Sequence, residues 1–207
     1  MITLYGYPGS RSLRAAWALE EAGADYLYQL VDLKKGEGRM PEFLRINPGG
    51  KVPALMHDDF VLTESAAICN YVGDIFPASG LTPPAGSRQR AVYDRWCYFA
   101  ATELEQPLWT LAKHRFALPE RWRVPAIMPT AEYELSVAIK VLEAGLGEQS
   151  YILGNQFTAA DILISNTLKW ARTNQLLPMT DQFHAYLERT LRRPALLRAE
   201  EREKQGQ

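Results

Sequence analysis

Residues 51–66 of the chain read KVPALMHDDFVLTESA, and this stretch indicates how the first part of the chain folds. Two short apolar runs, residues 54–57 and residues 60–63, flank an acidic pair and predict a tight β-hairpin. The bond between Val52 and Pro53, just before the hairpin, is a candidate for the cis isomer, which is readily accessible only before proline. We therefore expect Val52 to pair its N–H and C=O groups with an extended, peptide-like ligand.

The end of the same stretch predicts the start of a helix. Glu64 and Ser65 directly follow the second predicted strand, and the apolar residues after them continue as a helix. A helix start offers unpaired N–H groups and partial positive charge, which suit a carboxylate, while the Glu64 side chain suits an ammonium group. An α-amino acid carries both groups, so we interpret this corner as a peptide-binding site. The alternative is a plain helix cap by Thr63 or Ser65.

Composition and charge exclude several classes of partner. The chain has 207 residues, 47% of them hydrophobic and 23% charged, with a formal net charge of −1. It is long enough for one large domain or two small ones, and no bulk field attracts nucleic acid or an anionic membrane. We expect neither export nor membrane insertion. Cys69 and Cys97 have no metal-ligand or CxxC spacing, which indicates buried, reduced thiols and a cytoplasmic protein.

Changes in hydrophobic period predict an α/β first domain. Residues 2–5 and 26–31 are predicted strands, joined by a predicted helix. Because a helix crosses between them, these two strands must be parallel. With a short helix over residues 41–46 and the hairpin that follows, residues 1–77 are predicted to have the order βαβαββα.

The second part of the chain is predicted to be all α-helical. Residues 78–86 have the Pro-rich and Gly-rich composition of a linker, and residues 87–207 show helical spacing without a convincing strand. Thr158 and Asp161 form a helix-start signature, in which the threonine caps and the aspartate reaches back to the backbone. The charged residues 200–205 are interpreted as a solvated or frayed end.

The order of these motifs resembles that of the cytosolic glutathione transferases. The shared motifs are YPGS (residues 7–10), NPGGKVPAL (residues 47–55), LTESAAI (residues 62–68) and FTAAD (residues 157–161). Each is weak alone, but the four in this order span nearly the whole chain. The resemblance implies a thioredoxin-like N-terminal domain and an all-helical C-terminal domain. It also implies a bacterial protein of the serine type, beta-like overall with a theta-like or delta-like first loop.

By that resemblance the first domain binds glutathione. The main chain of Val52, before cis Pro53, is expected to pair with the cysteinyl unit. Glu64 and Ser65 are expected to hold the γ-glutamyl end, and Lys51 to face the glycyl carboxylate.

Catalysis in this family depends on forming a thiolate, and Ser10 is the predicted donor to the sulfur. A free thiol with a pKa of about 8.5 is only a few per cent ionised near neutrality, yet the anion is the nucleophile. Lowering that pKa by about two units requires roughly 2.7 kcal/mol, which a hydroxyl hydrogen bond and a helix start can supply. Ser12 and Tyr5 are the other candidates, and a plain helix cap is the alternative role for Ser10.

The first loop of this chain differs from the motifs of several glutathione transferase classes, and these differences exclude some of their reactions. Arg11 stands where the beta-like class has its cysteine, so mixed-disulfide chemistry with glutathione lacks its attacking thiol. The zeta-like Ser-Ser-x-Cys pattern is also absent, which argues against isomerase activity. Gly6 stands where the tyrosine classes place their phenol, and Tyr5, one step away along a strand, points to the other face.

The electrophile pocket is expected in the helical domain. The candidates on its long helix and the exit from that helix are Tyr98, Glu103, Trp109, His114, Arg115 and Phe116. Of these, Trp109 and Arg115 are favoured, although aromatic residues on a helix more often belong to the core. The three histidines, at positions 57, 114 and 184, have no metal-binding spacing, so no metal site is expected.

The leading functional prediction is a detoxifying transferase that ionises glutathione as co-substrate and conjugates its sulfur to small hydrophobic electrophiles. No further cofactor is expected. A glutathione-dependent peroxidase or reductase is a second interpretation, and a non-catalytic binding scaffold is a third. The resemblance also implies a homodimer.

Overall fold

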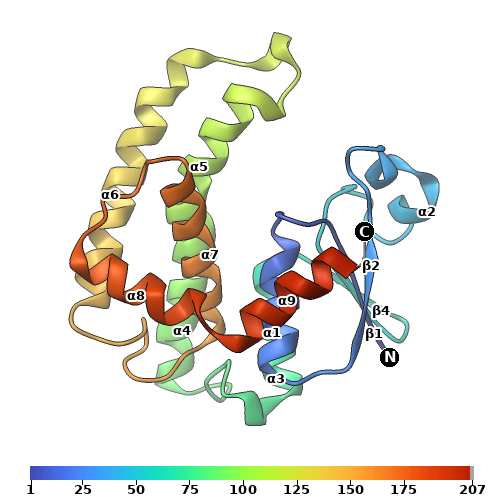
Figure 1. Cartoon of the computed structure of the whole chain (residues 1–207), viewed down its shortest axis with the longest axis horizontal. Helices are drawn as coiled ribbons and strands as arrows, with labels where there is room; N and C mark the ends of the chain where they lie inside the picture. The colour runs from blue at the N-terminus through green and yellow to red at the C-terminus, as the bar shows by residue number, and fades with distance from the viewer. Residues whose placement is uncertain (206–207) are drawn as a thin grey trace. The chain divides into compact units, whose positions relative to one another are not determined.

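A four-stranded mixed sheet forms the centre of the N-terminal part of the chain (Figure 1). In the computed structural model, which describes residues 1–205, β1 (Ile2–Gly6) runs parallel to β2 (Tyr26–Leu30) and antiparallel to β3 (Ala54–His57). β3 forms a hairpin with β4 (Phe60–Thr63), and the strand order is β2-β1-β3-β4. The predicted hairpin and the predicted parallel pair are both confirmed.

Helices cover both faces of this sheet. Figure 1 shows α1 (Ser12–Glu21) and α3 (Ser65–Ile75) on one side and α2 (Pro41–Leu44) on the other. Burial alternates along β1 because successive side chains of a strand point to opposite faces. On the α2 side, the rings of Tyr5 and Phe43 pack with their centroids 6.1 Å apart. Short 3₁₀ turns at Glu37–Arg39 and Pro77–Ser79 complete this part of the chain.

The C-terminal helix α9 (Pro194–Gln205) packs along α1. Arg193 forms an ion pair with Glu21, with Nε and Oε1 2.5 Å apart, and Arg198 pairs with Glu20 at 2.9 Å. Residues 200–205 were expected to be a solvated or frayed end. The segment is helical rather than frayed, and Arg202 within it also pairs with Glu20 at 3.5 Å, while Glu201, Lys204 and Gln205 are exposed to solvent.

Contacts divide the chain into two compact units. The first comprises Met1–Pro84 together with the chain from Leu191 onward, and the second comprises Ala85–Thr190. The domains expected from the sequence instead assign all of residues 87–207 to the helical part. The difference arises because α9 packs on α1, and the many charged residues of the C-terminal segment obscure the helical spacing that indicates its buried side.

The second unit is built from helices. Its α-helices are α4 (Arg88–Phe99), α5 (Glu105–Ala112), α6 (Met128–Leu146), α7 (Ala159–Thr173) and α8 (Asp181–Leu191). Wider π-helical turns at Ala100–Leu104 and Lys113–Ala117 flank α5, and 3₁₀ turns lie at Glu120–Trp122 and Pro125–Ile127. The first π turn precedes Pro107, which lacks an N–H and is poorly tolerated inside a regular helix.

A buried carboxylate organises the start of α7. Asp161 has no exposed surface, and its oxygens accept hydrogen bonds from the N–H groups of Ile152 (2.8 Å) and Thr158 (2.9 Å). The hydroxyl of Tyr186 on α8 also donates to it, at 2.9 Å. The predicted capping box of Thr158 and Asp161 is confirmed, and it also joins α7 to α8.

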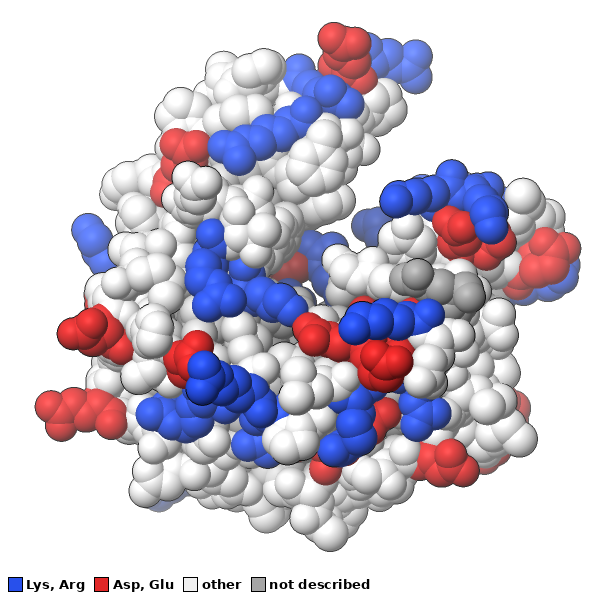
Figure 2. Space-filling view, in the orientation of Figure 1, with Lys and Arg blue, Asp and Glu red and all other residues white. Residues whose placement is uncertain are grey.

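No helix within residues 1–205 is long and apolar enough to cross a membrane. The surface carries charges of both signs. Figure 2 shows acidic and basic side chains interspersed over the face that it presents. This pattern agrees with the formal net charge of −1.

Candidate functional site

Three segments that carry predicted site residues leave the sheet at the same end. Tyr5 of β1 lies opposite Ala54 of β3, and Ala54 lies opposite Thr63 of β4. The loop that follows β1, the proline bond that precedes β3 and the helix start that follows β4 therefore emerge together. The sheet register, rather than proximity in sequence, assembles this site.

The Val52-Pro53 peptide bond is cis, as predicted. Pro53 is buried and Val52 is half-buried. Among the residues that the structure describes, none forms a hydrogen bond with the main-chain N–H or C=O of Val52. Both groups are available to an extended ligand, as strand-like recognition requires.

Glu64 occupies a strained backbone position at the start of α3. Its φ of 67° and ψ of 115° lie in a region that residues with a Cβ rarely adopt. Its side chain is exposed, and within residues 1–205 its carboxylate has no hydrogen-bond or ion-pair partner. The fold thus presents an unpaired negative charge beside the open N–H groups of a helix start.

Ser65 is oriented inward rather than toward solvent. The residue is only 6% exposed, and its hydroxyl oxygen accepts a hydrogen bond at 3.5 Å from Nη1 of Arg14, which is 4% exposed. A ligand at this corner would meet the main-chain N–H groups of the helix start in preference to the hydroxyl. Arg14 is a site residue that the sequence did not predict, because charged side chains are normally exposed.

The first loop brings two serine hydroxyls together. The Oγ atoms of Ser10 and Ser12 are 2.5 Å apart, and Ser10 Oγ also accepts the N–H of Ser12 at 3.1 Å. Ser12 Oγ accepts the N–H of Tyr7 at 3.0 Å. The Ser10 hydroxyl therefore accepts the N–H of the first residue of α1, although Arg11 occupies the N-cap position of that helix.

Accessibility distinguishes the three hydroxyls that were candidates for the sulfur donor. Ser12 has no exposed surface, and the ring of Tyr5 packs against Phe43. Ser10 is half-buried and lies two residues before Ser12, the first residue of α1. Its hydroxyl is the one that combines partial exposure with a helix start, where partial positive charge favours an anion.

Lys51 lies beside the proline bond with an exposed side chain. Its carbonyl oxygen accepts a hydrogen bond from Nδ2 of Asn47 at 2.6 Å, and Oδ1 of Asn47 accepts the N–H of Gly49 at 2.9 Å. The asparagine thereby fixes the loop that leads to Val52. The Lys51 ammonium group has no ion-pair partner among the described residues, so it is free to meet a carboxylate.

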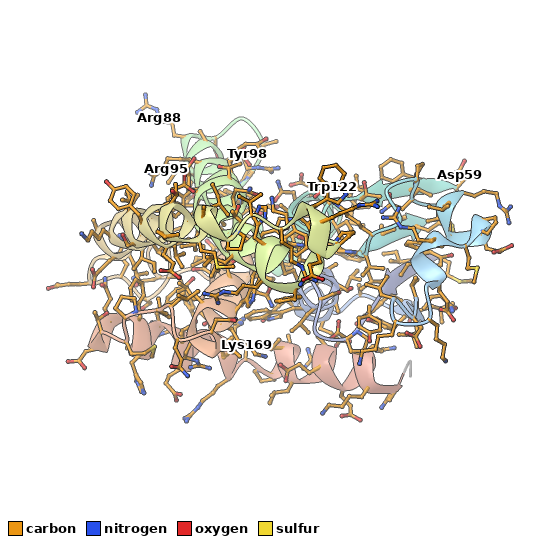
Figure 3. All side chains as sticks on the ribbon, turned by 90° about the horizontal axis from the view of Figure 1, so that it is seen from above. Asp59, Arg88, Arg95, Tyr98, Trp122 and Lys169 are labelled. Carbon is orange, nitrogen blue, oxygen red and sulfur yellow. The ribbon has the colours of Figure 1, made fainter. Side chains whose placement is uncertain are left out.

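The predicted pocket residues of the second unit occupy varied environments. Trp109 is half-buried in α5, while Arg115 is exposed and lies 3.4 Å from Glu132. The imidazole ring of His114 already has a hydrogen-bond partner, since its Nδ1 accepts the N–H of Val124 at 3.0 Å. Tyr98, which is labelled in Figure 3, is 71% exposed.

One open cavity of this unit, about 520 Å³ in volume, lies between α6 and α8 and includes Glu143, Gln182 and Arg189. None of the predicted pocket residues lines it. The assignment of Trp109 and Arg115 to an electrophile pocket therefore stays a prediction. Across residues 1–205, no cluster of three or more His, Cys, Asp or Glu side chains could hold a metal ion.

Comparisons with known proteins agree on one family. The model of the glutathione S-transferase N-terminal domain matches residues 1–74, and that of the C-terminal domain matches residues 113–194. Glutathione S-transferase GstA of Escherichia coli O157:H7 is 32% identical over 194 residues, which cover 92% of this chain and 93% of that protein.

Solved structures give the same result. The crystal structure of a glutathione transferase from Methylococcus capsulatus superposes with a TM-score of 0.86 at 33% identity, covering 99% of this chain and 100% of the other. A glutathione transferase homologue from Sulfitobacter, solved with bound glutathione, gives a TM-score of 0.80 at 26% identity and covers 97% of each chain.

Proposed function

The chain belongs to the glutathione S-transferase family, and on that basis we propose that its first unit binds glutathione and ionises the thiol for conjugation to small electrophiles. The main support for the proposal is the backbone of Val52 beside a cis proline. Its N–H and C=O form no hydrogen bond within residues 1–205, and they lie at the end of the sheet where Ser10 and Glu64 also lie. The reaction needs glutathione as co-substrate and no further cofactor.

Binding is proposed to use complementary groups along the tripeptide. The N–H and C=O of Val52 pair with the cysteinyl unit as an added strand would. The unpaired Glu64 carboxylate receives the γ-glutamyl ammonium group, while the N–H groups at the start of α3 receive the α-carboxylate. Lys51 faces the glycyl carboxylate, a solvent-exposed ion pair that contributes about 0–1 kcal/mol.

Thiolate formation is assigned to the first loop. The Ser10 hydroxyl donates a hydrogen bond to the sulfur, and the start of α1 adds partial positive charge, so the thiol releases its proton to solvent near neutral pH. The sulfur then forms a bond to the electrophilic carbon. In aromatic substitution a leaving group departs with its electron pair, and in addition to an activated alkene the adjacent carbanion takes a proton from water.

The Ser10→Ala variant tests this role. We expect the pKa of the bound thiol, followed by thiolate ultraviolet absorbance, to rise by about one to two units, since a charge-assisted hydrogen bond contributes roughly 1.5–3 kcal/mol. The turnover number with a chlorodinitrobenzene falls, while the dissociation constant of glutathione changes little. An unaltered pH–rate profile would transfer the role to another hydroxyl.

Ser87→Ala is the matched control. Ser87 caps α4 by accepting the N–H of Arg90 at 3.0 Å, and Ser10 accepts the N–H of Ser12 at the start of α1 at 3.1 Å. Each substitution removes one hydroxyl that accepts a main-chain N–H at a helix start, at a cost of about 1 kcal/mol of stability. Only the Ser10 variant is expected to shift the pKa of the thiol, which separates the chemical role from the structural one.

Two assays distinguish the alternative functions. Activity with an organic hydroperoxide that exceeds conjugation would identify a glutathione-dependent peroxidase, which needs no protein cysteine if glutathione supplies the reduced sulfur. Calorimetry that detects no glutathione binding would identify a non-catalytic scaffold. We expect conjugation, because Ser10, Val52 and Glu64 are all at least partly exposed at the same end of the sheet.

We also propose a homodimer that works in the cytoplasm. The family membership supports both, and the two buried cysteines, which form no disulfide, suit a reducing compartment. Sedimentation equilibrium of the purified protein measures the assembly state, and a monomeric mass at micromolar concentration would contradict the dimer.

A further inference from the structure

One carboxylate of α9 points into the first unit instead of toward solvent. Leu196, Ala199 and Glu203 recur at helical spacing and are all buried, with Glu203 only 4% exposed. An ionised carboxylate at such a position costs stability unless hydrogen-bond donors meet it. The groups that contact Glu203 therefore indicate what it does.

Glu203 reaches the first loop and the neighbouring strand. Its Oε2 accepts the N–H of Gly9 at 3.4 Å, and its Oε1 accepts the hydroxyl of Tyr28 at 3.4 Å. Gly9 directly precedes Ser10 and has a φ of 73°, a left-handed conformation that favours glycine. A single side chain of α9 thus holds the backbone of the loop and the phenol of a β2 residue.

The Tyr28 hydroxyl helps to hold this carboxylate in place. A carboxylate only accepts hydrogen bonds, so Tyr28 uses its one hydroxyl proton to donate to Glu203. The other oxygen of Glu203 faces the N–H of Gly9, the residue before Ser10. The position of the loop that carries Ser10 is therefore coupled to Glu203.

Tyr28 keeps its proton under ordinary conditions. Burial, and then the adjacent charge of Glu203, raise the pKa of the Tyr28 phenol well above its usual value of 10.0. At neutral pH the Tyr28 phenol therefore stays neutral and remains a hydrogen-bond donor to Glu203.

We propose that Glu203 is a positioning residue for Ser10. Its carboxylate, held in place by the Tyr28 hydroxyl, fixes the Gly9 N–H, so that the first loop presents the Ser10 hydroxyl to the sulfur of glutathione. This inference rests on the proposed role of Ser10. It assigns a function in the thiol chemistry to α9, although this helix supplies none of the groups proposed to contact glutathione.

Glu203→Gln and Tyr28→Phe test the proposal, with thiolate absorbance of bound glutathione as the readout. We expect each to raise the pKa of the thiol by about half a unit to one unit and to lower the turnover number three- to tenfold. The Michaelis constant for glutathione should stay within twofold, since Val52 and Glu64 are untouched. Glu201→Gln, an exposed position on the same helix, is the matched control.

The sign of the shift separates positioning from simple charge repulsion. If Glu203 acted only as a nearby negative charge, Glu203→Gln would lower the pKa of the thiol, and the proposal would be overturned. An unchanged pKa in a folded Glu203→Gln protein overturns it as well. Should Glu203→Gln fail to fold, Tyr28→Phe decides alone, because it retains the carboxylate and removes one hydroxyl.

A Ser10→Ala/Glu203→Gln double variant separates this inference from the proposed function. If Glu203 works through Ser10, the double variant should match Ser10→Ala in thiol pKa and turnover. Additive effects would show that Glu203 acts independently of Ser10 and would overturn the inference alone. A Ser10→Ala protein that behaves like the parent overturns the proposed function, and the positioning role with it.

Discussion

A Cβ placed on Gly6 would lie 2.5 Å from the hydroxyl oxygen of Tyr28 and 2.8 Å from the Cβ of Ser12. No other side chain fits this position at the end of β1, since contacts under 3.0 Å require something to shift. Gly6 also stands where the tyrosine classes carry their phenol. In this chain a phenol from the adjacent strand β2 occupies the neighbouring space, so glycine at this position is a packing requirement.

Gly6→Ala is expected to lower the free energy of unfolding by about 1–3 kcal/mol through overpacking. The loss should be smaller in a Tyr28→Leu background, where the obstructing hydroxyl is gone, and urea unfolding of the four proteins measures the difference. Equal losses in the two backgrounds would mean that the strain lies elsewhere.

Ser65→Ala is expected to affect stability more than binding. The substitution removes the acceptor that Arg14 reaches at 3.5 Å in a buried site, so unfolding should become easier by about 1 kcal/mol. The dissociation constant of glutathione, measured by calorimetry, should rise less than threefold, because the ligand is proposed to meet main-chain N–H groups. A rise of more than tenfold would show that the hydroxyl itself contacts the ligand.

Glu64→Gly and Glu64→Ala form a matched pair at a strained position. Both remove the carboxylate, so each should raise the dissociation constant of glutathione roughly tenfold or more, the value of a hydrogen bond to a charged group. Only glycine suits the φ of 67°, so Glu64→Gly should be more stable than Glu64→Ala by about 1 kcal/mol. Asp59→Asn, an exposed acid at the hairpin turn, is the control for loss of charge.

Cys97 is expected to be chemically inert in the folded protein. Burial raises the pKa of its thiol from 9.0 to about 12, and the residue is 4% exposed, while Cys69 has no exposed surface. Mass spectrometry after iodoacetamide treatment at pH 8 should show no modification until urea is added, and two modifications afterwards. Rapid alkylation of the native protein would contradict this burial.

The same pKa shift makes stability depend on pH. Because the pKa of Cys97 is raised in the folded state, its contribution is complete below about pH 9 and is lost as the pH rises toward 12. The free energy of unfolding should therefore fall between these values as the unfolded chain ionises its thiol. Cys97→Ser, which does not titrate in this range, should show a shallower decline.

Local patterns predicted the parts of the fold that depend on neighbours in sequence. The hairpin over residues 54–63 was predicted from two apolar runs and a turn between them. The cis bond was predicted from the proline at position 53 and its place before a strand. The capping box of Thr158 and Asp161 is likewise formed within four residues. In each case the interacting groups are close along the chain.

The network beneath the first loop could not be predicted in this way. Glu203 lies 194 residues from Gly9 and 175 from Tyr28 in sequence, and a charged residue in a charged segment is normally exposed. The spacing of Leu196, Ala199 and Glu203 is the one local signal of burial, and the surrounding charges obscure it. The burial of Arg14 was not predicted either, because a charged side chain is normally exposed.

The packing of α9 on α1 makes the first unit discontinuous along the chain. During synthesis, Glu20 and Glu21 leave the ribosome about 170 residues before the arginines that neutralise them, since Arg193 lies 172 residues after Glu21. An N-terminal fragment that stops before residue 193 would therefore leave this surface of α1 uncovered, with both carboxylates deprived of their arginine partners.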